Sequence, residues 1–175
     1  MNRVLVGLAV AAMAAVGVGG AAVPAAAMNA PTATRHSQVP EAIKVPAGNK
    51  KIAVMPARGV QTYQCTAGAW VFLQPDAILR YQGRPEVLHS KGPVWTSVRD
   101  GSSVTAAAQA NSPVPNAIPQ LLLRATANRG PGLFAGVTFI QRLNTTGGVA
   151  PAGACTDGTT ASVPYTADYT FWVAG

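Results

Sequence analysis

The sequence YTADYTFWV, residues 165–173, decides the fold class of this chain. Apolar or aromatic side chains occupy every second position, and most of the residues between them are polar. Successive side chains of a β-strand point to opposite faces, so this alternation predicts a strand with one buried face. We expect the buried face to comprise Tyr165, Ala167, Tyr169, Phe171 and Val173, and the other face to comprise Thr166, Asp168, Thr170 and Trp172.

Similar extended segments precede this strand and are separated by turn residues. Asp100 and Gly101 lie between two such segments, and Asp-Gly is a strong signal for a tight hairpin turn. We expect Pro75 to end one strand, because proline lacks the N–H that a strand ladder needs. The prolines at positions 113, 115 and 119 predict a longer surface loop.

The spacing of these segments predicts an all-β fold. About eight or nine short strands recur roughly every 8 to 12 residues, and the chain has no helical periodicity. This pattern is typical of an antiparallel sandwich or barrel, and it leaves both architectures open. We expect a single β-rich domain over residues 39–175.

The N-terminus has the pattern of an export signal. Arg3 precedes an apolar run over residues 4–18. Ala25, Ala26 and Ala27 follow and form a cleavage site of small residues. We expect residues 1–27 to be a signal peptide, residues 28–38 to be a flexible linker, and the protein to be secreted. The mature chain contains no further apolar run of the roughly 20 residues that a transmembrane helix needs.

The chain has two cysteines, Cys65 and Cys155. An even number in an exported chain favours pairing over two free thiols, so we expect one disulfide. The two residues are too far apart in sequence for a Cys-x-x-Cys redox motif. The sequence therefore predicts a structural cross-link.

The net charge of +7 excludes few partners by itself. The basic residues are scattered, with Lys50 and Lys51 as the only adjacent pair, and this distribution argues against a nucleic-acid partner. A cell-envelope polymer, a saccharide or a small ligand remains as the expected partner. The oligomeric state is left open.

Few residues offer chemistry. GPGLFA, residues 130–135, matches a dinucleotide fingerprint in form only, because β-branched residues follow it in place of a helix. We therefore expect no cofactor, and two distant histidines predict no metal site. The catalytic candidates are His89, Asp168 and Arg142, although we interpret His89 as structural and expect Asp168 to form an ion pair with Arg124 or Arg142.

Two functional hypotheses follow. We expect a non-catalytic extracellular module that has a binding or structural role, because the sequence lacks a convincing acid, base and nucleophile set. The alternative is an extracellular hydrolase or lyase that uses His89 with Asp168 and an arginine. Convergence of these groups in one cleft would favour the second hypothesis.

Several stretches of the chain resemble a known family. They include ARGVQTYQC (57–65), HSKGPVW (89–95), IPQLLLRA (118–125), IQRLNT (140–145) and VPYTADY (163–169). In combination they resemble the secreted bacterial and fungal proteins grouped as domain of unknown function 3455. The resemblance covers nearly all of the predicted mature chain. It implies no established activity, substrate or catalytic residue.

Overall fold

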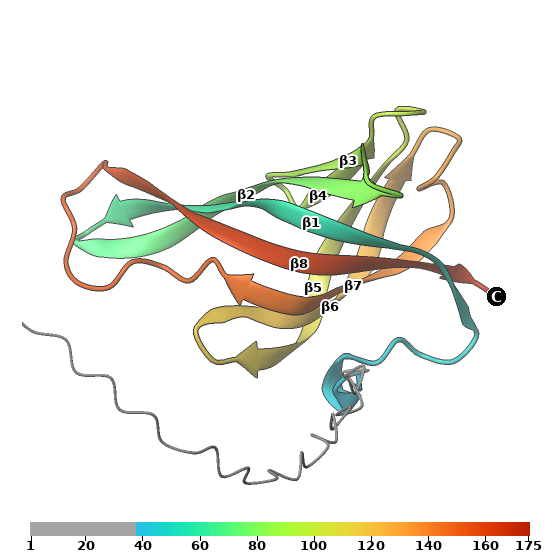
Figure 1. The fold of residues 1–175 in the computed structure, drawn as a ribbon, viewed down its shortest axis with the longest axis horizontal. Helices are drawn as coiled ribbons and strands as arrows, with labels where there is room; N and C mark the ends of the chain where they lie inside the picture. Colours follow the sequence, from blue (N-terminus) through green and yellow to red (C-terminus); the bar gives the residue numbers. More distant parts are fainter. Residues whose placement is uncertain (1–37) are drawn as a thin grey trace, which may run out of the picture. The chain divides into compact units, whose positions relative to one another are not determined.

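A computed structural model describes residues 38–175 of the chain (Figure 1). The predicted signal peptide and nearly all of the predicted linker lie outside these residues. The described part contains one short 3-10 helix, η1, followed by eight strands. Their bounds are η1 Glu41–Ile43, β1 Asn49–Thr66, β2 Ala69–Tyr81, β3 Arg84–Ser90, β4 Val94–Ser97, β5 Ser103–Val114, β6 Ala117–Arg129, β7 Val137–Gly147 and β8 Thr160–Ala174.

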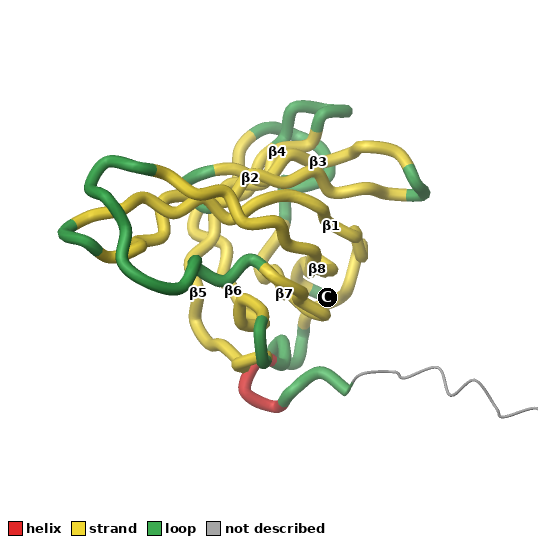
Figure 2. Tube along the Cα trace, turned by 60° about the vertical axis from the view of Figure 1, so that its left-hand side comes forward, coloured by secondary structure: helices red, strands yellow, loops and turns green. Residues whose placement is uncertain are grey.

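The eight strands form one closed antiparallel barrel. Each strand pairs with the next along the chain, and β8 returns to pair with β1, so the sheet has no free edge (Figures 1 and 2). This topology confirms the all-β antiparallel prediction, and of the two predicted architectures it is the barrel. At eight strands, the interior of a barrel is either filled by side chains or wide enough for one small ligand.

The strands are longer and less interrupted than predicted. Two predictions that depended on prolines were wrong. Pro75 does not end a strand: it lies within β2, paired with Gln61, and a register shift at Thr62/Tyr63 adjoins it. The expected proline-rich surface loop is a tight β5–β6 hairpin in which Val114 pairs with Ala117. Register shifts accommodate proline in a sheet because they remove the need for its missing N–H.

The barrel interior is the hydrophobic core. The alternation predicted for residues 165–173 is confirmed: Tyr165, Ala167, Tyr169 and Phe171 are buried. Val173 is only partly buried, and it packs against the edge of the core. The largest fully buried side chains of this core are those of Trp95, Tyr169, Phe134, Phe171, Met55 and Leu79.

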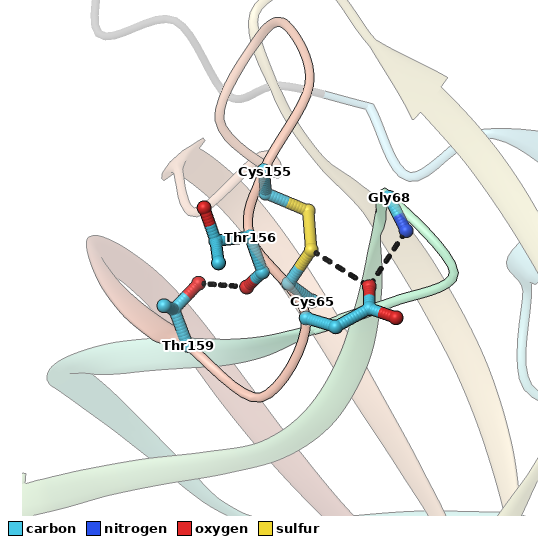
Figure 3. Close-up of a disulfide and its surroundings, with 6 residues drawn as sticks. Cys65, Gly68, Cys155, Thr156 and Thr159 are labelled. Atoms are coloured by element: carbon cyan, nitrogen blue, oxygen red, sulfur yellow. Dashed lines mark hydrogen bonds between the residues drawn. A yellow bond between two sulfur atoms is a disulfide. The ribbon is translucent and has the colours of Figure 1, made fainter.

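The predicted disulfide forms between Cys65, near the end of β1, and Cys155, in the segment before β8. The Cα atoms are 5.8 Å apart, although 90 positions separate the residues in sequence. Two contacts support the cross-link. The Cys65 N–H donates to the Thr159 carbonyl at 2.8 Å. The Gly68 N–H donates to Asp157 Oδ1 at 2.8 Å, and Figure 3 shows this contact beside the disulfide. The bond therefore fixes the long β7–β8 connection to the first hairpin.

The segment around η1 covers part of the outer face of the barrel. Ile43 is fully buried there, and its carbonyl accepts a hydrogen bond from Gln141 Nε2 at 2.7 Å. Trp172 Nε1 donates to Gln141 Oε1 at 3.0 Å on the same outer face. No helix within residues 38–175 has the length and apolar character needed to cross a membrane.

Candidate functional site

The barrel interior is not completely filled. A cavity of about 320 Å³ lies inside it, and every strand contributes at least one residue to its lining. This volume is within the range of roughly 300 to 1,000 Å³ found for small-molecule sites. The apolar lining includes Phe72, Leu73, Trp95, Ile118, Leu121 and Leu123, and the polar lining consists of Gln61, Tyr63, His89, Arg142 and Tyr169.

His89 lies in the cavity lining as a neutral residue. Its ring stacks on Trp95 with centroids 4.1 Å apart, and its Nδ1 lies 3.0 Å from the Val94 carbonyl. Since a carbonyl oxygen can only accept, Nδ1 is the donor, and Nε2 carries the lone pair. Burial lowers the pKa of His89 to about 4, against a smaller opposing effect of the Val94 hydrogen bond. The imidazole is therefore uncharged at neutral pH.

Arg142 supplies the only formal charge among the cavity-lining residues. Its Nε and Nη2 donate to the Pro119 carbonyl at 3.1 and 2.9 Å. That carbonyl is available because the β6–β7 register shifts between Ala117 and Leu121, so Pro119 has no partner on β7. The strand irregularity around Pro119 thus positions the guanidinium in the cavity.

Asp168 does not join His89 and Arg142. It alternates with the buried Tyr169, it is absent from the cavity lining, and its Oδ2 accepts from Asn144 Nδ2 at 2.8 Å. The expected ion pair of Asp168 with an arginine is wrong. The two ion pairs that form within residues 38–175 are Lys44–Glu41 and Arg99–Glu86. The reason is the strand period, which places neighbouring residues on opposite faces.

Three tyrosines extend the polar side of the cavity region. The Tyr63 hydroxyl donates to the Gly148 carbonyl at 2.6 Å, and the hydroxyls of Tyr165 and Tyr169 lie 3.3 Å apart. Burial raises the pKa of each of these tyrosines, and the positive charge of Arg142 partly offsets the increase. The hydroxyls are therefore protonated at neutral pH, and Arg142 lies close enough to act on all three.

Two buried donors of the lining have no hydrogen-bond partner within the described part of the chain. They are Nε2 of Gln61 and Nε1 of Trp95. Both residues are almost fully buried, with 3% and 1% of their surfaces exposed. An unpartnered buried donor costs roughly 1 to 3 kcal/mol, so these two groups are polar weak points of the packing around the cavity, and both atoms are shielded from the cavity space itself.

Sequence reasoning found His89 and Arg142 but missed Gln61, Tyr63 and Pro119. Gln61 and Tyr63 are two positions apart and both lie on the inner face of β1. The sequence pattern available for Gln61 was a glutamine flanked by strand-forming residues. The importance of Pro119 depends on a register shift that no local pattern predicts. Residues 38–175 contain no group of three His, Cys, Asp or Glu side chains placed to hold a metal ion.

The fold and the site define a closed eight-stranded antiparallel barrel with a hollow, mainly apolar interior. The chain belongs to the family described as "Protein of unknown function (DUF3455)", whose model matches residues 80–173. This range contains His89 and Arg142. Gln61 and Tyr63, the cavity residues of β1, lie before it. Searches of curated proteins and of solved structures find no match.

Proposed function

We propose that this protein is an exported, non-catalytic binding module that holds one small molecule inside its barrel. The observation that supports this proposal most is a cavity of ligand size to which all eight strands contribute, and which is lined by Arg142, a residue that forms no ion pair within residues 38–175. The export part is supported by the signal-like N-terminus and by the disulfide, which is typical of oxidising compartments.

The composition of the lining favours binding over catalysis. The cavity residues include no serine, threonine, cysteine, lysine, aspartate or glutamate. His89 would therefore have no carboxylate and no serine, threonine or cysteine nucleophile beside it inside the cavity. Asp168, which the hydrolase or lyase hypothesis requires, lies on the other face of β8 and bonds Asn144.

The size of the cavity favours a small ligand over a polymer. A volume of about 320 Å³ that is lined by residues of all eight strands has room for one compact molecule. A cell-envelope polymer would have to bind on the outer surface.

A thermal-shift screen with two matched variants tests the binding function. Ala108 and Ala107 are consecutive residues of β5, and only Ala108 lines the cavity. A ligand at about 100 times its Kd should raise the Tm of the wild type by on the order of 10 °C. Ala108→Phe, which places a phenyl ring at the exposed edge of the cavity, should reduce this shift, and Ala107→Phe should preserve it. Shifts that are equal in both variants, or no shift across a broad library, would exclude the inner site.

Mass spectrometry of the protein recovered after expression in a secreting host tests the export function. The expected product begins at Met28 and contains the Cys65–Cys155 bond. A product that retains residues 1–27 inside the cell would contradict export while leaving the binding proposal untouched.

A further inference from the structure

The charge of Arg142 is not balanced within the barrel. Two of its donors bind the Pro119 carbonyl, which is neutral, and neither ion pair formed by residues 38–175 includes Arg142. A guanidinium has five N–H donors, so three remain after these two bonds, and the Tyr169 hydroxyl is the one further protein partner of Arg142 within the described residues. A cation in an apolar cavity is costly without a counter-charge, and a ligand can supply one.

The remaining polar groups of the lining are uncharged. Nε2 of His89 and the Tyr63 hydroxyl, which already donates to Gly148, can accept hydrogen bonds. The cavity thus presents the free N–H groups of one guanidinium and no carboxylate. Such a lining suits a ligand whose oxygens accept hydrogen bonds.

The lining includes a packed aromatic cluster. The rings of His89 and Trp95 are nearly parallel, with an interplanar angle of 5°, and Tyr169 packs against both rings edge-on. Because the three rings support one another, their positions are fixed before a ligand enters. Phe72, Ile118, Leu121 and Leu123 supply the rest of the apolar lining.

We propose that the ligand is a small organic monocarboxylic acid whose carboxylate binds Arg142 and whose apolar body lies among the aromatic and aliphatic residues of the cavity. This inference rests on the proposed binding function and names its ligand class. A guanidinium and a carboxylate match in shape and charge. A phosphate monoester carries close to two negative charges, which a single arginine does not balance. A neutral saccharide would leave the guanidinium without a counter-charge.

The test compares acids with their primary amides, which match them in size and shape. The probes are benzoic, 2-naphthoic, octanoic and decanoic acid, each paired with its amide, and binding to the purified protein is measured by calorimetry at pH 7. We expect at least one acid to bind about tenfold or more tightly than its amide, as the loss of a charge-assisted contact implies.

Three arginine variants make the result specific. Arg142→Gln should reduce the affinity for the acid to that for the amide, and Arg142→Lys should keep a reduced preference for the acid. Arg124→Gln, which changes an exposed arginine on β6 outside the cavity, should bind as the wild type does. Thermal melts and near-ultraviolet circular dichroism establish whether each variant is folded. If Arg142→Gln does not fold, Arg142→Lys still tests the proposal.

Failure of this inference differs from failure of the proposed function. Equal affinity for acids and amides, both reduced in Ala108→Phe, would overturn the carboxylate and leave the binding module intact. An acid preference that survives Arg142→Gln would also overturn it. If no acid in the panel binds, the inference is wrong, and the broader library decides the binding function separately.

Discussion

Removal of the Cys65–Cys155 disulfide should lower the stability of the barrel more than any other change at its rim. The bond joins residues 90 positions apart. In the chain-entropy model, a loop of this length restricts the unfolded chain enough to stabilise the fold by about 4.6 kcal/mol at 25 °C. Since domains of this size are stable by about 5 to 15 kcal/mol, the loss is a large part of the total.

The assay is equilibrium unfolding in urea, followed by tryptophan fluorescence, for the wild type and the double variant Cys65→Ala/Cys155→Ala. We expect the free energy of unfolding to fall by about 3 to 5 kcal/mol, and the m-value to rise because the unfolded chain is less restricted. Asp157→Ala removes the Gly68 contact but keeps the bond, and should cost no more than about 1 kcal/mol. A loss below about 1 kcal/mol in the double variant would refute the reasoning.

Three further predictions concern single residues. Gly59→Ala should lower the free energy of unfolding by about 1 to 3 kcal/mol, because the added Cβ would meet the Asp76 carbonyl and lie 2.5 Å from Ala77 Cβ. At Gly136 an added Cβ has room, so Gly136→Ala should lower it by less than about 1 kcal/mol. Urea unfolding measures both. Hydrogen bonds from Ser102 and Leu133 hold the pKa of Asp100 well below its ordinary value. The stabilising effect of the Asp100 carboxylate is therefore present above about pH 4 and is lost as the pH falls. Asp100→Asn should make the Tm fall less steeply at acid pH in melts recorded against pH. Burial lowers the pKa of His89 to about 4, so the unfolded chain takes up a proton first as the pH falls below 6.5. This residue should therefore destabilise the fold by up to about 3 kcal/mol near pH 4. The effect should be absent from His89→Gln, and NMR titration should show the low imidazole pKa directly.

The sequence predicts the strands well and their interruptions poorly. The alternation in residues 165–173 identifies the inner face of β8, because one face of a barrel strand is buried along its whole length. Pro75 and Pro119 mislead local reasoning, because a proline inside a strand is tolerated where the register shifts, and register is a property of two strands. The closure of the sheet between β1 and β8 likewise depends on pairing between the two ends of the domain.

The candidate site was predictable only in part. His89 and Arg142 could be selected because charged or titratable residues are rare in this chain. Asp168 belonged to the same set, yet its position beside the inward-facing Tyr169 already indicated the outer face. Gln61 could not be distinguished from a surface glutamine, since the evidence for its role is a buried amide without a partner, and that requires three-dimensional contacts.

The most direct test of the account is the NMR signal of the Trp95 indole N–H. The chain has three tryptophans, so a ¹H–¹⁵N spectrum contains three indole signals. Trp95 Nε1 is buried in the cavity lining without a partner, whereas Trp172 Nε1 is bonded to Gln141 on the outer face. Titration with the tightest-binding organic acid should shift the Trp95 signal and leave that of Trp172 in place. A Trp95 signal that stays fixed while the acid binds would contradict a ligand site inside the barrel.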